Sequence, residues 1–230
     1  MKKQNYSYVG ISFVILVFGI LFVPKIVNRI TGNYIVDKDR HQLDHGTQIT
    51  EDLAVIGPAP YFALMNQHGD TITAQDMRGK VYVLEFFFTT CPSICPIMSQ
   101  NLLQVQDAFY DHQDVGVISI SINPDYDRPE VLLAYAQQYG MTHPNWHLLT
   151  GNSKTISALA NSGFNLYVGP GSEVDGGFEH SGFFALVDGD GQIRSRRDNF
   201  DNPIIYYDGL EQKQIEKLIF DIQTLLEDKS

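Results

Sequence analysis

Two continuous runs of apolar, β-forming residues constrain this fold more than any other feature of the sequence. They are Val81–Phe88 (VYVLEFFF) and Val115–Ile122 (VGVISISI). A strand with apolar side chains on both faces has to be covered on both faces, which is typical of a parallel sheet between helices. Glu85 interrupts the first run, so its carboxyl group needs a partner if it is buried. The two runs predict an α/β fold.

Helical and extended patterns alternate along the rest of the chain. Apolar positions spaced three and four apart predict a helix over 97–109, and Pro129 opens another that extends to about 139. The pattern further predicts strands at 146–150 and 183–187, a hairpin turn at 188–191 with a return strand from 192, helices at 153–160 and 212–226, a glycine-rich loop at 164–177, and extended segments at 58–64 and 71–73 around a turn at 66–70. This order predicts a thioredoxin-like α/β fold with an N-terminal hairpin and an inserted helix.

An uncharged apolar run, residues 8–23, lies close to the N-terminus. Its length is near the minimum of about 17 residues that crosses a bilayer. No small-residue cleavage site follows it, because Pro24 and Lys25 come next. We therefore expect residues 1–27 to form one uncleaved transmembrane helix.

The residues after this anchor fall into two parts. Residues 28–56 are polar without a clear period, which predicts a linker, and residues 57–230 form the folded domain. Basic residues are balanced on the two sides of the apolar run, and the free amino terminus favours a cytoplasmic N-terminus. The domain is then expected on the outer face of the membrane, which is the periplasmic side of the inner membrane in a bacterium with two membranes.

The net charge of the chain argues against a nucleic-acid partner. The first thirty residues hold four basic side chains and no acidic one, so residues 31–230 carry −15 against −11 for the whole chain. An acidic domain is repelled by phosphate backbones. The acidity serves solubility, and it also suits a basic protein partner.

The only two cysteines of the chain, Cys91 and Cys95, lie between a predicted strand and a predicted helix. Pro96 is tolerated only in a first helical turn, so Cys95 lies at the helix start and Cys91 in the preceding loop. Both sulfur atoms then face the positive end of the helix dipole, which favours thiolate over thiol. A close pair of this kind indicates a redox dithiol or a metal site.

Three residues separate the cysteines, one more than in the usual Cys-x-x-Cys pair of disulfide exchange. The longer loop can place both sulfurs on one ion, and it can close a disulfide if the backbone adjusts. Two thiolates suit Cu(I) or Zn(II), but a structural zinc site would need a fourth protein ligand. Two cysteines and one histidine suit Cu(I), and the same set with a water or carboxylate suits Cu(II). Inert buried cysteines fit poorly at a strand end, where the chemistry of α/β sheets gathers.

His180 is the candidate third ligand. It lies in the segment GGFEHSGFF, in a predicted loop that enters the strand 183–187, and in a thioredoxin-like fold this loop lies beside the cysteine loop. Glu179 could orient its ring or act as a weak fourth ligand. The other histidines are expected in other roles: His41 and His45 solvated in the linker, His68 in a turn, His112 near a helix C-terminus, and His143 and His147 as packing residues.

With these residues in place, the chain resembles the Sco/SenC family of copper chaperones for cytochrome c oxidase assembly. The matching segments span the domain from about residue 58 to 226: FTTCPSICP at 88–96, SISINPDYD at 119–127, WHLLTG at 146–151, EHS at 179–181 and LVDGDG at 186–191. The resemblance implies a single N-terminal anchor and copper held by Cys91, Cys95 and His180. Departures at Ser93, Asn123 and Glu179, where relatives often carry Asp or another acid, concern the outer shell of the site.

The leading hypothesis is a metallochaperone rather than an enzyme. It would bind one copper ion per chain, as Cu(I) or Cu(II), exchange it with other copper carriers, and deliver it to the dinuclear copper centre of the copper-bearing subunit of cytochrome c oxidase. The alternative is a thiol–disulfide oxidoreductase that reduces the cysteines of that centre, in which Cys91 attacks and Cys95 resolves. A third hypothesis, a peroxidase or redox sensor, is disfavoured by the wide cysteine spacing and by His180.

Overall fold

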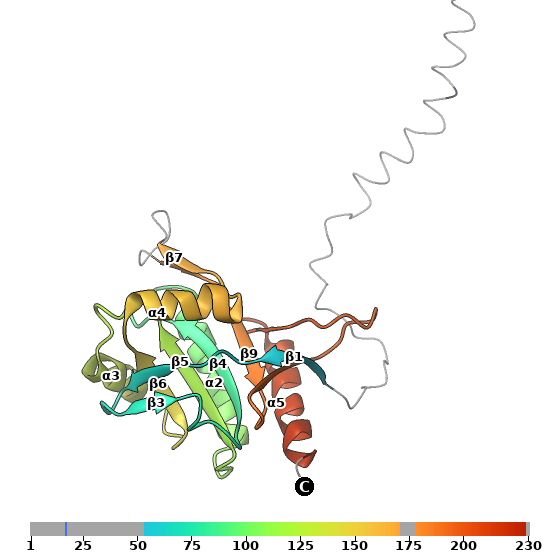
Figure 1. Ribbon diagram of the computed structural model, residues 1–230, viewed down its shortest axis with the longest axis horizontal. Helices are drawn as coiled ribbons and strands as arrows, with labels where there is room; N and C mark the ends of the chain where they lie inside the picture. Colours follow the sequence, from blue (N-terminus) through green and yellow to red (C-terminus); the bar gives the residue numbers. More distant parts are fainter. Residues whose placement is uncertain (1–16, 18–52, 171–177, 229–230) are drawn as a thin grey trace, which may run out of the picture. The chain divides into compact units, whose positions relative to one another are not determined.

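The computed structural model describes Val17, residues 53–170 and residues 178–228. Within these ranges no helix is both long and apolar enough to cross a membrane. The predicted membrane helix over residues 1–27, apart from Val17, and residues 28–52 of the predicted linker lie outside the described residues. Figure 1 shows the domain from Leu53 onward.

A mixed sheet of nine strands forms the centre of the described domain, in the order β1-β10-β9-β4-β5-β6-β2-β3, with β11 paired to β9. Its parallel pairs are β4 with β5 and β5 with β6, and its other neighbours are antiparallel. The strands are β1 (Ala54–Pro58), β2 (Ala63–Asn66), β3 (Thr71–Thr73), β4 (Val81–Phe87), β5 (Val115–Ser121), β6 (Trp146–Thr150), β9 (Phe183–Val187), β10 (Gln192–Ser195) and β11 (Tyr207–Asp208). A separate antiparallel ribbon pairs β7 (Val168–Pro170) with β8 (Phe178–His180).

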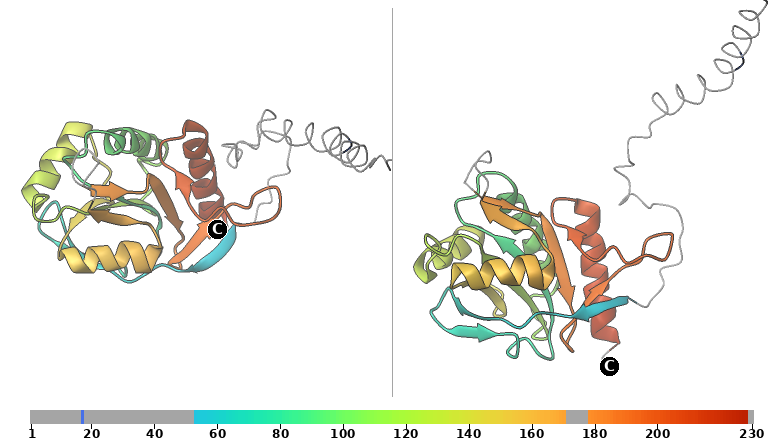
Figure 2. Two further views of the ribbon diagram at one scale, coloured as in Figure 1. Left: turned by 90° about the horizontal axis from the view of Figure 1, so that it is seen from above. Right: turned by 45° about the horizontal axis from the view of Figure 1, so that its top comes forward.

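Helices cover both faces of the sheet. They are α2 (Ile94–Ala108), α3 (Pro129–Tyr139), α4 (Ser153–Ala158), its π-helical continuation η2 (Leu159–Phe164), and α5 (Gln212–Glu227). Helix α4 lies on the face opposite α2 and α5 (Figure 2). Every residue of β4 and of β5 is buried, as their continuous apolar sequences require.

The mixed α/β fold and the order of its elements confirm the sequence-based prediction. The predicted N-terminal hairpin is β2 and β3, the predicted turn at 188–191 joins β9 to β10, and α5 closes the chain. Pro129 is the first residue of α3, where its missing N–H costs no hydrogen bond.

Three segments differ from the prediction. Residues 53–56, expected in the linker, are part of the domain: Leu53 is buried, and residues 54–56 belong to β1, which pairs with β10 through a bulge between Val55 and Gly57. The predicted helix at 153–160 continues to Phe164, where Asn165 takes a positive φ and ends it. The segment 164–177, expected as a loop, contains β7, and His180 ends β8 instead of lying in a loop.

Candidate metal centre

The turn between β4 and α2 brings the two cysteines together. After β4 ends at Phe87, the Cys91 N–H donates a hydrogen bond to the Phe88 carbonyl at 3.2 Å, which folds the chain back toward the helix. The Cys95 N–H then donates to the Cys91 sulfur at 3.5 Å. The side chain of the N-cap residue, Ser93, makes no capping hydrogen bond to the backbone, so the Cys91 sulfur accepts one of the N–H groups that a helix start leaves unpaired. The predicted position of both sulfurs at the positive end of α2 is confirmed.

Burial differs slightly between the two thiols. Cys91 is 8% exposed and Cys95 is 1% exposed, and neither forms a disulfide. The hydrogen bond with Cys91 and, after it, burial raise the pKa of the Cys95 thiol well above its ordinary value. At Cys95 the contact with Cys91 and burial therefore oppose the helix dipole, which favours the thiolate. A thiophilic ion has to displace the Cys95 proton when it binds.

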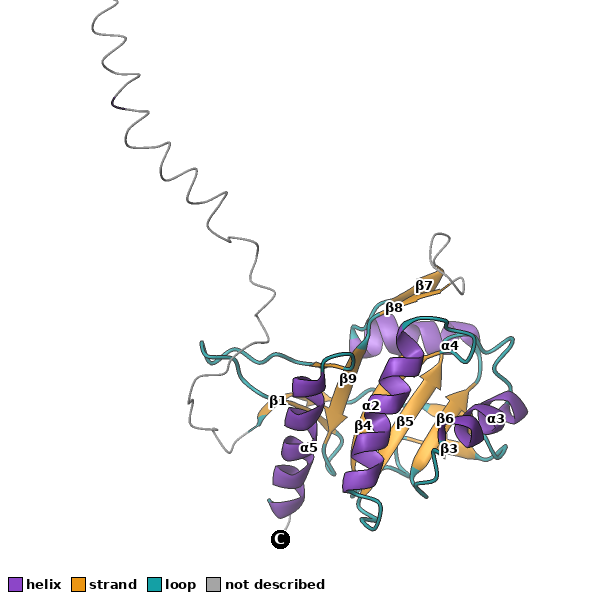
Figure 3. Cartoon of the chain, turned by 180° about the vertical axis from the view of Figure 1, so that it is seen from behind, coloured by secondary structure: helices purple, strands orange, loops and turns teal. Residues whose placement is uncertain are grey.

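The backbone of β8 lies at the same end of the sheet as the cysteines. His180 pairs with Val168, and two residues later the chain passes the first turn of α2: a Cβ on Gly182 would lie 3.8 Å from Ile94 Cδ1. Figure 3 shows the β7–β8 ribbon at the end of the sheet toward which β5 points. The chain segment that carries His180 therefore approaches the segment that carries Cys95. The side chains of His180 and Glu179 lie outside the described residues.

No group of three or more metal-ligating side chains occurs among the residues whose side chains the structure describes. The predicted packing role of His143 is confirmed, because its Nε2 contacts the Phe109 carbonyl at 3.2 Å and its Nδ1 accepts from the Asn145 N–H at 3.1 Å. His112 packs edge-to-face on Phe109. His41 and His45 lie outside the described residues.

A buried aspartate that the sequence analysis did not single out fixes the cysteine turn, the segment from Thr89 to Cys95 that joins β4 to the start of α2. The Asp127 carboxylate is fully buried and accepts hydrogen bonds from the Thr89 N–H at 3.1 Å, from the Thr89 hydroxyl, and from the Ser121 hydroxyl at 2.5 Å. Thr89 lies two residues before Cys91, and Ser121 ends β5. Polar residues at the carboxyl ends of two adjacent parallel strands were the signal that could have identified this network.

Glu85 has a partner for only one of its carboxyl oxygens. Its Oε1 accepts from the Ser119 hydroxyl at 2.8 Å, and the same Ser119 oxygen accepts from Trp146 Nε1 at 3.1 Å. Its Oε2 is buried and has no hydrogen-bond partner in the described part of the chain. Burial raises the pKa of Glu85 to about 8. At neutral pH the side chain is therefore mostly a neutral acid inside the sheet.

Comparison with known proteins places these features in a family. The family model for SCO1/SenC matches residues 53–214. A SCO1 protein homolog of Bacillus subtilis is 29% identical over 165 residues, which cover 71% of this chain and 80% of the relative. A SCO2-like protein of Rickettsia typhi is 32% identical over 148 residues, which cover 63% of this chain and 70% of the relative.

Solved structures of related proteins share the fold. A SCO1/SenC family lipoprotein from Bacillus anthracis superposes with a TM-score of 0.64 at 30% identity, covering 74% of this chain and 95% of that one. BsSco, a member of the Sco family of cytochrome c oxidase assembly proteins in which a disulfide switch was identified, gives 0.63 at 27% identity, with coverages of 78% and 98%. ScoI of Bradyrhizobium japonicum with copper bound gives 0.57 at 23% identity, with coverages of 73% and 99%, which shows likeness of fold.

Proposed function

This chain belongs to the SCO1/SenC family, and from that premise we propose that it binds one copper ion through Cys91, Cys95 and His180 and delivers it to the copper site of cytochrome c oxidase. The observation that carries the proposal is the convergence of two buried thiols at the start of α2, where the Cys95 N–H meets the Cys91 sulfur. Copper-bound ScoI and the oxidase-assembly role of the Sco family, to which BsSco belongs, support the choice of ion and client.

The donor set fits copper as a transferable cargo. Two thiolates and one imidazole satisfy Cu(I) in a three-coordinate site, and the same ligands with one more donor satisfy Cu(II). Cys95 has to lose its proton on loading, which makes copper uptake release protons. The Asp127 network holds the turn that carries Cys91, so that the sulfur is in place before the ion arrives.

We also propose the membrane arrangement expected from the sequence. Residues 1–27 anchor the chain, residues 28–52 link the anchor to the sheet, and the domain lies on the periplasmic side of the bacterial inner membrane. The uncharged run at 8–23 and the basic residues before it support this arrangement.

Copper stoichiometry of the full chain with both thiols reduced tests the proposal. We expect one copper per chain, and we expect weakened or lost binding in Cys91→Ser, Cys95→Ser and His180→Ala. His68→Ala is the matched control, because His68 is exposed in the β2–β3 turn, and it should bind copper as the unmodified chain does. Binding that is indifferent to the cysteines, or no binding at all, would contradict the proposal.

A second function, reduction of a disulfide in the oxidase copper site, is favoured by the closeness of the two thiols and by the disulfide switch of BsSco. The more exposed Cys91 would attack one target sulfur and release the other as a thiol. Cys95 would then attack the mixed disulfide, so that the target leaves reduced and a Cys91–Cys95 disulfide remains. This reaction does not need His180, so a His180→Ala protein that reduces the target at the normal rate would favour it over metal delivery.

A further inference from the structure

The loop between β10 and β11, residues 196–206, is an ordered turn that holds one aromatic side chain in solvent. Asp198 Oδ1 accepts from the backbone N–H groups of Phe200 at 2.8 Å and Asn202 at 2.9 Å, and Asp198 and Asn202 pair through their backbones. Arg197 donates to the Asp201 carbonyl at 2.9 Å. Phe200 at the tip is 85% exposed, more than any other large apolar side chain that the structure describes.

The base of the same loop is fixed to the sheet. The Ile205 N–H donates to the Ser195 hydroxyl at 2.7 Å, which holds Ile205 at a positive φ that a β-branched residue rarely adopts. Pro203 and Ile205 are also exposed, so the apolar surface continues from the tip along one arm of the loop. The loop therefore projects from the domain (Figure 2), and the exposed side chains that it carries are apolar at its tip and along one arm.

The position of this loop matches the point where the chain enters the domain. Ala54, the first residue of β1, pairs with Ser195, the last residue of β10, and the Arg194 guanidinium donates to the Leu53 carbonyl at 2.8 and 3.2 Å. The segment that leads back to the apolar run at 8–23 thus joins the sheet directly beside the loop.

The cysteines lie at the same end of the sheet as this loop, the end at which β4 and β10 finish. Strand β10 is antiparallel to β9, and β9 is antiparallel to β4, so β10 and β4 point the same way. The loop leaves the carboxyl end of β10, and the turn that carries Cys91 leaves the carboxyl end of β4. A surface that touches the loop is therefore on the side of the proposed copper site.

The loop is also electrically neutral within a strongly acidic domain. Residues 196–206 contain two arginines and two aspartates, whereas residues 31–230 carry −15. Arg196 pairs with the buried Asp221 at 2.5 Å, and Arg197 pairs with Asp201 at 3.5 Å. Anionic headgroups repel acidic surfaces, so a neutral apolar projection is suited to approach a bilayer that contains them.

We propose that Phe200 and its loop insert into the headgroup region of the bilayer in which the chain is anchored, and so hold the cysteine edge of the sheet toward the membrane. The proposal rests on the anchor proposed at residues 1–27 and does not depend on copper. The proposed linker, residues 28–52, is long enough for this contact, because 25 residues span at most about 80 Å. The domain is then oriented with its metal ligands facing a membrane-embedded recipient.

Fluorescence quenching in vesicles tests this orientation. The full chain is reconstituted into unilamellar vesicles of phosphatidylcholine and phosphatidylglycerol, with or without bromine on the acyl chains near the headgroups. Trp146 is the single native tryptophan and is 2% exposed, so the unmodified chain gives a low background of quenching. The test variant is Phe200→Trp.

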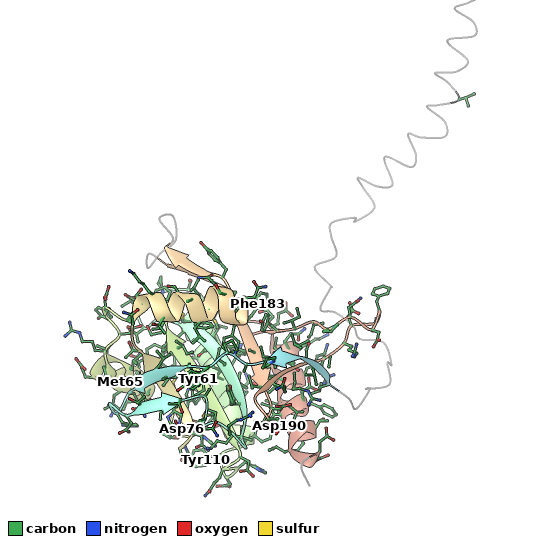
Figure 4. The ribbon with its side chains drawn as sticks, viewed as in Figure 1. Tyr61, Met65, Asp76, Tyr110, Phe183 and Asp190 are labelled. Atoms are coloured by element: carbon green, nitrogen blue, oxygen red, sulfur yellow. The ribbon has the colours of Figure 1, made fainter. Side chains whose placement is uncertain are left out.

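Tyr110→Trp is the matched control. Tyr110 is 49% exposed and follows the C-terminal end of α2, at the sheet edge opposite the loop (Figure 4). We expect brominated lipid to quench Phe200→Trp several-fold more than Tyr110→Trp and to shift its emission to shorter wavelength.

Equal quenching of the two variants would overturn the proposal and would indicate that the loop contacts a protein partner instead of the bilayer. A chain that does not float with the vesicles would overturn it as well, because the anchor is its premise. Copper stoichiometry of Phe200→Trp, measured in parallel, should equal that of the unmodified chain. Loss of copper binding in both proteins would contradict the proposed function and leave the quenching result standing.

Discussion

Replacing Glu85 by glutamine should change how the stability of the domain depends on pH. Glu85 is buried in the middle of β4, and only its Oε1 has a hydrogen-bond partner, the Ser119 hydroxyl. Burial raises its folded-state pKa from 4.5 to about 8. The unfolded chain exposes the same carboxyl group to water, where it keeps its ordinary pKa.

The direction of the effect follows from which state holds the proton. Below about pH 4.5 both states are protonated, so Glu85 adds no pH dependence. Between that pH and about 8 the folded state keeps the proton and the unfolded state loses it. The free energy of unfolding then falls by about 1.4 kcal/mol for each pH unit, or about 3 kcal/mol by pH 7 and on the order of 5 kcal/mol by pH 8.

Urea denaturation of the two proteins from pH 5 to pH 8 measures this loss. The unmodified chain should lose several kcal/mol more than Glu85→Gln over that range. Burial lowers the pKa of His143 and of His147, which makes stability rise with pH, but this contribution is common to both proteins and cancels in their difference. Glu216→Gln, the same change at an exposed position of α5, should follow the unmodified chain. Parallel curves for the unmodified chain and Glu85→Gln would refute the reasoning.

Three further sets of substitutions test separate parts of the structure. Asp127→Ala leaves the buried donors of Thr89 and Ser121 without an acceptor, and should lower the free energy of unfolding in urea by about 3 kcal/mol or more. A loss under about 1 kcal/mol would show that this network does not fix the turn that carries Cys91. Arg196→Met removes the ion-pair partner of the buried Asp221 and should lower the free energy of unfolding by about 3 kcal/mol. Adding Asp221→Asn should recover much of this loss, because the buried charge is then gone. If the double variant recovers nothing, an unpaired charge is not the cause of the loss. Burial should make the thiol of Cys91→Ser react with iodoacetamide more slowly than that of Cys95→Ser, and equal rates would contradict the described exposures.

The sheet and the cysteine turn could be predicted because their physical causes are local in the sequence. Strands β4 and β5 are buried on both faces, so apolar residues are favoured at every one of their positions and the apolar runs are continuous. Pro96 restricts where α2 can begin, which places Cys95 in its first turn. These constraints need no knowledge of distant residues.

The features that the sequence did not reveal depend on distant pairing. Asp127 is 38 residues from Thr89, and its role appears only when the ends of β4 and β5 meet at one edge. The β7–β8 ribbon has three residues in each strand, too few for a recognisable alternation. The exposure of Phe200 is a property of a turn held by Asp198, and composition alone does not distinguish such a turn from an irregular loop.

X-ray absorption at the copper edge of the loaded full chain tests the proposed metal site most directly, because sulfur and nitrogen ligands scatter differently. We expect two sulfur ligands and one imidazole nitrogen per copper, with loss of the imidazole signal in His180→Ala and of one sulfur in Cys95→Ser. A copper ion whose ligands are all oxygen and nitrogen, or whose spectrum is unchanged in both variants, would contradict the assignment of Cys91, Cys95 and His180.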